Sequence, residues 1–191
     1  MSIKKIAVFA SGRGSNLEAL LRGQQESSYQ ISLVIVSKEK AHALEIARIN
    51  KIAFLVLDKP RFTDTTELLS TLNSYKIDFI CLAGFLWKIP SYLIKSFPDR
   101  IVNIHPSLLP KFGGKGMYGM KVHEAVIAQK ETVSGITIHL VNEEYDKGRV
   151  LFQKKIDVLE NESAASLAAR ILILEHTYFP MVVRDLCNAE K

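Results

Sequence analysis

A short segment near the middle of the chain combines an amide, an imidazole and two prolines in a pattern that can do chemistry. It reads Asn-Ile-His-Pro-Ser-Leu-Leu-Pro and runs from Asn103 to Pro110. If the apolar residues before it form a strand, Asn103 and His105 leave the same face of that strand. Pro106 and Pro110 disfavour continuation of a strand or a helix, so we expect the polar pair at a strand end.

An amide and an imidazole held together can polarise a carbonyl group. Asn103 offers an uncharged N–H donor, and His105 can exchange a proton near neutral pH. Together they can stabilise the oxyanion that forms when a nucleophile attacks a carbonyl carbon. The alternative is that Asn103 caps a turn and His105 only packs against the prolines, which is the default for so short a motif taken alone.

The apolar pattern around this segment predicts an α/β fold. Near-continuous apolar runs, typical of parallel strands covered on both faces, alternate with segments of helical spacing. The strand-like runs are Lys5–Ala10, Ile31–Ser37, Ala53–Leu57, Phe79–Ala83 and Ile101–Asn103. The helical segments are Asn16–Gly23, Ala41–Asn50 and Asp64–Tyr75. We expect a doubly wound, mostly parallel sheet that holds the polar pair at its carboxyl edge.

The last third of the chain departs from this alternation. Val133–Val141 and Val150–Val158 are extended runs whose connection is too short for a helical crossover, so we expect them to pair antiparallel. A C-terminal helix should follow Ser163, a suitable N-cap, and Pro180 should kink or interrupt it. No repeat or linker divides the sequence, so we expect a single domain over residues 1–191.

Composition restricts the class of protein. The 191 residues are 48% hydrophobic and 24% charged, with a formal net charge of +5, as in a globular domain. Dispersed basic residues argue against a nucleic-acid partner. Cys81 and Cys187 lack metal-ligand spacing, and His123 lacks the second histidine of a zinc motif, so no metal is expected. The absence of signal-peptide and transmembrane patterns predicts a cytoplasmic location and no membrane partner.

A glycine-containing loop after the first strand-like run can bind an anion. Ser-Gly-Arg-Gly-Ser-Asn, residues 11–16, leads into a helical segment whose free backbone N–H groups attract phosphate. It lacks the Gly-Lys-Ser/Thr of Walker A, and Leu17 stands where the dinucleotide fingerprint has a small residue, so a single phosphate suits it better than a pyrophosphate. The alternative is a tight turn with Ser15 or Asn16 as N-cap.

Acidic residues gather between the two late extended runs. In Glu-Glu-Tyr-Asp-Lys-Gly, residues 143–148, carboxylates by default are solvated or stabilise the turn. If Asp146 instead lies beside His105, it should favour the imidazolium and raise its pKa. The sequence leaves both interpretations open, and the role of His139 in the preceding run is ambiguous.

At this point the sequence resembles the glycinamide ribonucleotide formyltransferases. The likeness spans nearly the whole chain and rests on Ser11–Asn16, Leu82–Phe85, Asn103–Pro110, Asp146–Gly148 and the late-helix residues Glu175, His176, Tyr178 and Pro180. It implies an enzyme that transfers a formyl group from 10-formyltetrahydrofolate to the amine of 5'-phosphoribosylglycinamide in de novo purine (IMP) biosynthesis. It also implies direct attack by the amine, small-molecule partners, and a monomer or homodimer.

The resemblance assigns roles to individual residues. The catalytic group would be Asn103, His105 and Asp146. The ribonucleotide phosphate would be held by Gly14, Ser15 and Asn16. Glu175 would accept hydrogen bonds from the ribose hydroxyls, unless it is an exposed helix carboxylate. The folate would be bordered by Leu86, Trp87, Lys88, Ile89, Asn103, Glu143, Glu144 and Tyr145.

Some positions depart from the family pattern, and several related activities remain as alternatives. Trp87 stands where many relatives have arginine, so the folate contact there must differ, and the loop Gly113–Met120 is longer and richer in glycine. The Leu109–Pro110 bond can be cis, as in relatives.

A formyltetrahydrofolate hydrolase would usually carry a regulatory domain, and a methionyl-tRNA formyltransferase would usually carry an RNA-binding domain. A sugar-amine formyltransferase fits the phosphate loop less well, and a non-catalytic nucleotide-binding module is the alternative from another class.

Overall fold

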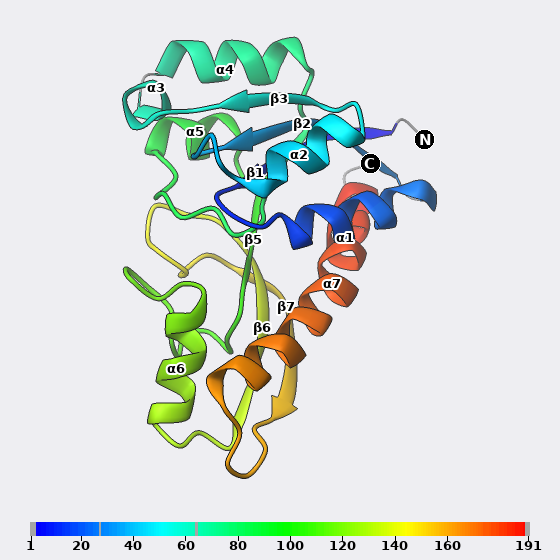
Figure 1. Cartoon of the computed structure of the whole chain (residues 1–191). Coiled ribbons are helices and arrows are strands. Elements are labelled where there is room, and N and C mark those ends of the chain that lie inside the picture. Colours follow the sequence, from blue (N-terminus) through cyan, green and yellow to red (C-terminus); the bar gives the residue numbers. More distant parts are fainter. Residues whose placement is uncertain (1–2, 27, 64, 190–191) are drawn as a thin grey trace.

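The computed structural model describes residues 3–26, 28–63 and 65–189, and its centre is a seven-stranded sheet in the order β3-β2-β1-β4-β5-β6-β7 (Figure 1). Five strands pair in parallel: β1 (Lys4–Ala10), β2 (Tyr29–Val36), β3 (Ala53–Val56), β4 (Phe79–Leu82) and β5 (Ile101–His105). The sheet continues antiparallel through β6 (Val133–Leu140) and β7 (Val150–Asp157). The predicted fold class, including the antiparallel C-terminal pair, is confirmed.

Two apolar cores lie on opposite faces of the sheet. Ile6 and Val8 of β1 belong to one core, whereas Ala7 and Phe9 belong to the other, because successive side chains of a strand point to opposite faces. The first core is covered by α1 (Ser15–Gly23), α2 (His42–Ile49), α6 (Met120–Ala128) and α7 (Ala164–Ala189). The second is covered by α3 (Lys59–Thr63), α4 (Thr65–Ser74) and α5 (Ser91–Ser96). A short 3-10 helix, η1 (Gln24–Glu26), follows α1.

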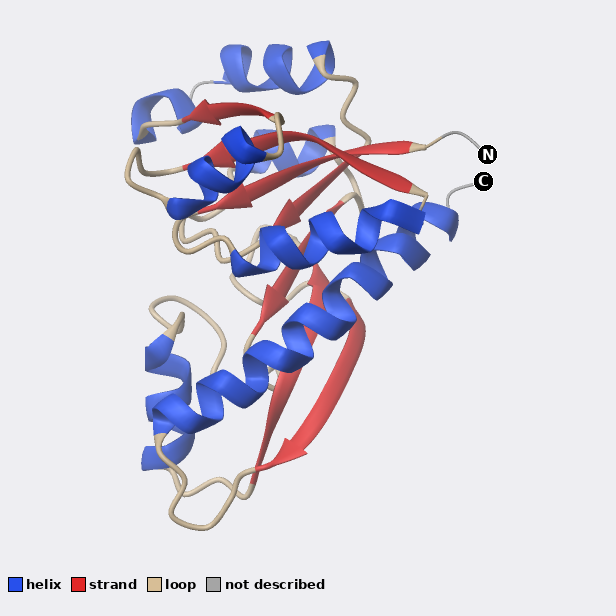
Figure 2. Ribbon diagram, turned by 45° about the vertical axis from the view of Figure 1, so that its right-hand side comes forward, coloured by secondary structure: helices blue, strands red, loops and turns tan. Residues whose placement is uncertain are grey.

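The C-terminal helix α7 runs along one face of the sheet and packs against α1, α6 and strands β5 to β7 (Figure 2). Ser163 is its N-cap, because its Oγ accepts the Ser166 N–H at 3.2 Å. The helix continues through Pro180, so the prediction that this proline interrupts it is wrong. A Cβ added to Gly23 would lie 2.5 Å from Pro180 Cβ. Close packing on α1 therefore outweighs the one backbone hydrogen bond that proline removes.

The helices between the later strands were not predicted from the sequence. α5 follows β4, and α6 fills the connection between β5 and β6 after the glycine-rich loop. The expected helix start at Asp64 lies outside the described residues, and α4 accounts for the rest of that segment. The Leu109–Pro110 bond is cis. Within the described part of the chain, no helix has the length and apolar character needed to cross a membrane.

The strand order brings the motifs to one edge of the sheet. β1 lies next to β4, and β4 lies next to β5, so the loops that follow these strands emerge side by side. These loops contain Ser11–Asn16, Leu86–Ile89 and Pro106–Pro110. The loop between β6 and β7 then adds Asp146, as the contacts below show.

Candidate active site

Asn103 and His139 form a hydrogen-bonded pair across β5 and β6, where they are opposite each other in the ladder. Asn103 Nδ2 lies 3.0 Å from His139 Nε2, and His139 Nδ1 lies 2.8 Å from the Leu140 carbonyl oxygen. A carbonyl can only accept, so His139 carries its proton on Nδ1 and accepts the Asn103 N–H at Nε2. His139 is therefore part of the site, and it fixes the orientation of the Asn103 amide.

His105 is held by a backbone carbonyl on one side and faces a carboxylate on the other. Its Nε2–H donates to Phe112 O at 2.8 Å, and its Nδ1 lies 3.7 Å from Asp146 Oδ2. Burial lowers the pKa of His105, although Asp146 and the Phe112 carbonyl act in the opposite direction. The expected effect of Asp146, which favours the imidazolium, is present, but desolvation outweighs it and the net pKa is lowered. At pH 7 the ring is mainly neutral, with Nδ1 free to accept a proton.

Asp146 connects the two histidines. Its Oδ1 lies 3.7 Å from His139 Nε2, and its Oδ2 accepts the Gly114 N–H at 2.8 Å. Burial opposes ionisation of this carboxyl, but the Gly114 N–H and the two histidines in their protonated forms more than compensate, so its pKa lies below the ordinary value. The side chain is 14% exposed, which excludes a freely solvated turn residue. The structure thus brings Asn103, His105 and Asp146 together.

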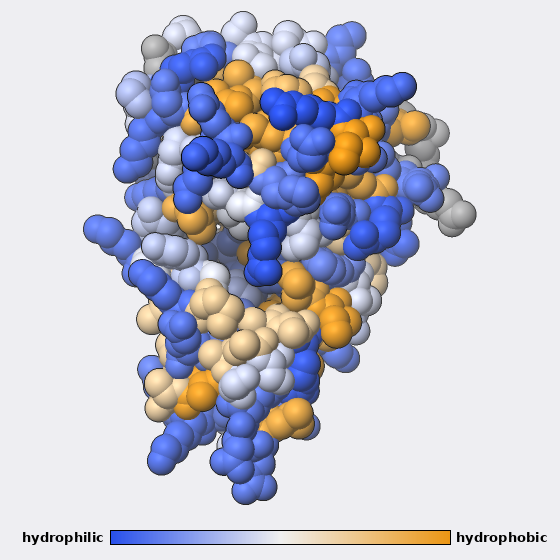
Figure 3. Space-filling model, in the orientation of Figure 1, coloured by the Kyte–Doolittle hydropathy of each residue, from blue (hydrophilic) through white to orange (hydrophobic). Residues whose placement is uncertain are grey.

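A cavity of about 70 Å³ opens beside this cluster. Asn103, His139 and Asp146 line it, together with two walls from separate loops. One wall consists of Leu82 and Phe85–Ile89, and the other of Val141, Asn142, Glu144 and Tyr145. The face drawn in Figure 3 is hollowed between its upper and lower parts, at the height where Figure 1 shows these loops. Of the residues expected to border the folate, Glu143 alone does not line the cavity.

Trp87 gives its wall an aromatic character in place of a charge. Its ring centroid lies 5.4 Å from that of Phe62 and 5.7 Å from that of Phe85. Phe85 in turn packs edge-on against Phe9 of β1. Aromatic pairs at these separations attract each other beyond simple burial. The residue that departs from the family pattern therefore stiffens the apolar wall.

The loop before α1 is tightly packed. Gly14 is the N-cap of α1, with φ 80°, and no side chain caps the helix, so the alternative with Ser15 or Asn16 as N-cap is wrong. A Cβ on Gly14 would lie 2.7 Å from Ile46 Cδ1 and 3.0 Å from Ala43 Cα. Ser11 Oγ accepts hydrogen bonds from Ser37 Oγ at 2.6 Å and from the Leu86 N–H at 3.2 Å. The loop is thus fixed to the ends of β2 and β4.

Asn16 and Glu175 form a buried pair between α1 and α7. Each residue is 8% exposed, and Asn16 Nδ2 donates to Glu175 Oε2 at 2.7 Å. Burial raises the pKa of Glu175 to about 7, although the hydrogen bond from Asn16 opposes this shift. Asn16 Oδ1 is buried without a hydrogen-bond partner. The alternative that Glu175 is an exposed helix carboxylate is therefore wrong.

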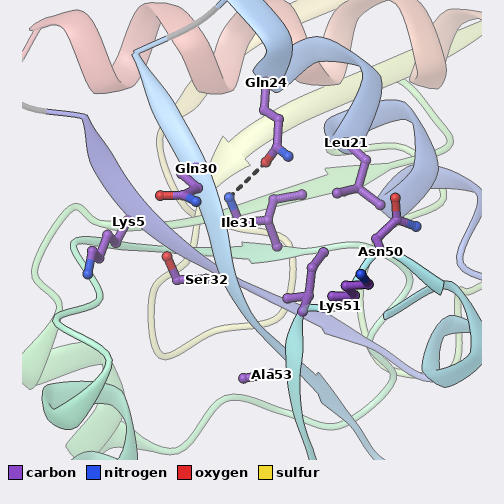
Figure 4. A pocket seen from close by; sticks show the side chains of 10 residues that line it. Lys5, Leu21, Gln24, Gln30, Ile31, Ser32, Asn50, Lys51 and Ala53 are labelled. Atoms are coloured by element: carbon purple, nitrogen blue, oxygen red, sulfur yellow. Dashed lines mark hydrogen bonds between the residues drawn. The ribbon is translucent and has the colours of Figure 1, made fainter. Parts of the chain in front are cut away.

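A larger cavity of about 350 Å³ lies at the amino-terminal edge of the sheet, away from these residues. Figure 4 shows Lys5 and Lys51, two of its polar residues, on opposite sides of β2. The hydrogen bond drawn there, from the Ile31 N–H to Gln24 Oε1 at 2.9 Å, gives this backbone N–H a partner at the start of β2. The polar groups of the larger cavity do not point toward one another. The side chains that line the smaller cavity, and not its volume, therefore make it the candidate active site.

Some groups of the site could not be predicted from the type of residue that carries them. The Phe112 carbonyl and the Gly114 N–H are backbone groups, and only the glycine content of their loop marked it as unusual. Alternation along β6 placed His139 on the face opposite Ile138, but its position across from Asn103 follows from a register that the sequence does not reveal.

Comparison with known proteins agrees with this arrangement. The sequence model described as formyl transferase matches residues 4–183. Over 97% of its length the chain is 44% identical to the chloroplastic phosphoribosylglycinamide formyltransferase of Vigna unguiculata, of which it spans 61%. It is 33% identical to the phosphoribosylglycinamide formyltransferase of Bacillus subtilis, with 96% of this chain and 95% of that protein aligned.

The fold is also shared with a solved structure. Glycinamide ribonucleotide transformylase 1 from Symbiobacterium toebii superimposes with a TM-score of 0.89 at 32% identity, over 98% of this chain and 89% of that one. The family match covers most of the chain and includes every segment that lines the site. The protein therefore belongs to the formyl transferase family.

Proposed function

We propose that this chain transfers the formyl group of 10-formyltetrahydrofolate to the amine of 5'-phosphoribosylglycinamide, in de novo purine (IMP) biosynthesis. The observation that carries the proposal is the convergence of Asn103, His105, His139 and Asp146 beside one cavity. Membership of the formyl transferase family and relatives named for this activity support it.

The reaction needs a nucleophile, a stabilised oxyanion and a path for one proton. The acceptor amine attacks the formyl carbon, so a C–N bond forms and the carbonyl electrons move to oxygen. When the tetrahedral intermediate collapses, the bond to folate N10 breaks and the proton lost by the amine is delivered to N10. Asn103 uses one Nδ2 hydrogen for His139. Its second hydrogen is available to the oxyanion.

His105 supplies the charge that changes during the reaction. Because its Nε2–H is held by the Phe112 carbonyl, a proton taken up by the ring goes to Nδ1, next to Asp146. The proton is the one lost by the attacking amine, which reaches Nδ1 through water and passes through water to N10 when the C–N10 bond breaks. While it resides on the ring, the ionised Asp146 stabilises the imidazolium, and the Nδ1–H can also donate to the developing oxyanion. The proposed mechanism uses no metal ion and no covalent enzyme intermediate.

The acceptor site divides into a part that donates hydrogen bonds and a part that accepts them. The uncapped first turn of α1, at Gly14 and Ser15, offers N–H groups that suit a phosphate. Asn16 Oδ1 accepts hydrogen bonds, and so does the Glu175 carboxyl, most strongly when it is ionised above its pKa of about 7. Such groups suit ribose hydroxyls better than a phosphate. We therefore place Asn16 with Glu175 at the ribose rather than at the phosphate.

The cavity walls suit a flat heteroaromatic donor. Its apolar lining comes from Phe85, Leu86, Trp87, Ile89 and Val141, and Asn142 and Glu144 add polar groups to it. Mostly apolar walls with a few polar groups are typical of sites for such ligands. This composition supports the pterin of 10-formyltetrahydrofolate as the occupant, with the formyl group toward Asn103.

A coupled assay tests the proposal. The purified protein is supplied with 10-formyltetrahydrofolate, with and without 5'-phosphoribosylglycinamide, and release of tetrahydrofolate is followed together with formation of the formylated acceptor. Release that requires the acceptor is the expected result. Release without the acceptor would identify a hydrolase, and no release in either mixture would favour a non-catalytic nucleotide-binding module.

Two substitutions test the catalytic group. Asn103→Ala and His105→Ala each remove a partner of the oxyanion, and kcat should fall roughly 100- to 1000-fold in each. Asn50→Ala, an exposed amide at the other end of the sheet, is the matched control and should leave kcat unchanged. Near-normal turnover in both site variants, with folding verified by circular dichroism, would remove this mechanism.

A further inference from the structure

The Ser11 hydroxyl joins the loops that follow three neighbouring strands of the sheet. Ser11 comes directly after β1. Its Oγ accepts hydrogen bonds from Ser37 Oγ, directly after β2, at 2.6 Å and from the Leu86 N–H, in the segment after β4, at 3.2 Å. The strands β2, β1 and β4 lie side by side. Ser11 is therefore the point at which the loop before α1 meets the wall of the active-site cavity that contains Leu86.

This wall has little hydrogen bonding of its own. Residues 84–89 belong to no helix or strand, and all of them are described. Of their backbone N–H and carbonyl groups, the Leu86 N–H alone makes a hydrogen bond within the described part of the protein. The bonding of β4 ends just before them, where the Ala83 N–H donates to the Phe9 carbonyl oxygen at 2.8 Å. Hydrogen bonding therefore fixes the backbone of the wall at one point, which is Ser11.

Side-chain packing does not replace this hydrogen bond. The rings of Phe85 and Trp87 pack against Phe62 and against each other, but apolar contacts are non-directional and leave a backbone free to shift. Leu86 lies between the two aromatic residues, lines the cavity and is 40% exposed. The directional constraint on the part of the wall that faces a ligand is therefore the bond from the Leu86 N–H to Ser11.

The surroundings of Ser11 suit this role better than contact with a phosphate. The residue is 5% exposed. Its Oγ already accepts from two donors, which uses the full acceptor capacity of a hydroxyl oxygen. The N–H groups that we assign to the phosphate belong to Gly14 and Ser15, at the start of α1. Ser11 thus lies in the phosphate loop by sequence, but its hydroxyl contacts the wall assigned to the pterin.

We propose that Ser11 is a positioning residue for the formyl donor: through the Leu86 N–H it fixes the wall that contacts the pterin, although its own loop serves the formyl acceptor. This inference rests on the proposed function. A ligand loses affinity when it has to order the groups that it binds. Loss of the Ser11 hydroxyl should therefore weaken binding of the folate and leave binding of the ribonucleotide unchanged.

Direct binding of each substrate tests this without turnover. Trp87 is the single tryptophan of the sequence and lines the cavity, so its fluorescence can report binding of tetrahydrofolate, which carries no formyl group. Calorimetry measures binding of 5'-phosphoribosylglycinamide. Ser11→Ala should raise the Kd for tetrahydrofolate roughly 10-fold, the cost of ordering a few side chains of the wall, with the Kd for the ribonucleotide unchanged. Ser11→Thr keeps the oxygen and should retain most of the folate affinity, whereas Ser11→Cys, whose sulfur accepts weakly, should give an intermediate loss.

A matched control separates the two hydrogen bonds of Ser11. Ser37→Ala removes the other bond but leaves the bond to Leu86, so this variant should bind both compounds like the wild type. Thermal unfolding checks that every variant is folded. Weaker ribonucleotide binding in Ser11→Ala, no effect on either compound, or an equal loss of folate affinity in Ser37→Ala would overturn the role of Ser11 while leaving the transferase proposal standing. Failure of the wild type to bind tetrahydrofolate would overturn both.

Discussion

Backbone carbonyls determine which nitrogen of each active-site histidine is free to act. The Leu140 carbonyl holds the proton of His139 on Nδ1, and the Phe112 carbonyl holds that of His105 on Nε2. Each ring therefore has one defined free nitrogen: His139 uses it to accept from Asn103, and His105 turns it toward Asp146. In the proposed mechanism these two residues of the same type therefore have different roles, a positioning role for His139 and a proton-accepting role for His105.

The positioning role of His139 leads to a prediction for a double variant. His139→Ala removes the acceptor that orients the Asn103 amide, so kcat should fall roughly 10- to 100-fold with little change in donor KM. The double variant Asn103→Ala/His139→Ala should be hardly slower than Asn103→Ala alone, since both changes disable one amide. Independent, multiplicative losses in kcat would show instead that His139 acts on the substrates by another route.

At the scale of elements, the site combines side chains on strands β5 and β6 with groups from two turns. Phe112 and Asp146 both have left-handed backbone conformations, with φ of 56° and 55°. Such angles are uncommon outside glycine, and here both residues are tied to the site, by His105 Nε2–H at the Phe112 carbonyl and by the Gly114 N–H at Asp146. Five other described non-glycine residues share this conformation away from the site, so the angle itself does not mark the site. At Phe112 and Asp146 the hydrogen bonds give it a positioning role.

The tight turn before α1 leads to a prediction for a glycine. Gly14→Ala adds a Cβ at a position with φ 80° and places it 2.7 Å from Ile46 Cδ1, so the free energy of unfolding in urea should fall by about 1–3 kcal/mol. KM for the phosphorylated acceptor should also rise, because the first turn of α1 must shift, while donor KM should not.

Gly12 provides the matched control for this stability measurement. No atom lies within 4 Å of a Cβ added there, so Gly12→Ala should leave the unfolding free energy within about 0.5 kcal/mol of the wild type. Equal destabilisation by both substitutions would show that the loss does not come from the contact of Gly14 with α2.

The sequence predicts the elements well where local patterns decide them. The apolar runs that became β1 to β5 and the short connection between β6 and β7 each carry a local signal, and the cluster of motifs at one edge follows from strand order in such folds. α6 was missed because its apolar face follows a glycine-rich segment with no cap signal. Pro180 was misjudged because the packing partner that tolerates it, Gly23, is remote in the chain.

Within the site, the sequence indicates which residues take part but not their electrostatics. Asn103, His105 and Asp146 were predicted to act together, and the structure places them together. The predicted effect of Asp146 on the pKa of His105 is present, but burial outweighs it, and the degree of burial cannot be read from a motif. The pairing of Asn16 with Glu175 likewise depends on how α7 docks against α1.

At the scale of the whole molecule, a buried acid makes stability depend on pH. The pKa of Glu175 is about 7 in the folded state, against an ordinary value of 4.5, so the folded chain binds this proton more tightly than the unfolded chain. The resulting stabilisation is fully present below pH 4.5 and is lost as pH rises through 7. The loss should amount to something on the order of 3 kcal/mol.

Chemical unfolding at a series of pH values checks this prediction. Glu175→Gln should remove most of the decline in unfolding free energy between pH 5 and pH 8, since the amide keeps the shape of the carboxyl without titrating. Glu18→Gln, an exposed carboxyl on α1, should retain the wild-type slope. An unchanged slope in Glu175→Gln would mean that another group titrates over this range.

The contact between Asn16 and Glu175 joins positions that are 159 residues apart, and this has a consequence for how the protein becomes active. A ribosome releases the segments that form β1, α1 and the loop before it long before it releases α7. Until that last helix docks, the two side chains that we propose to bind the ribose do not exist as a pair. Nascent chains, and chains truncated before α7, should therefore be unable to bind the proposed ribonucleotide acceptor. Binding should appear in one late folding step, when the two ends of the polypeptide meet.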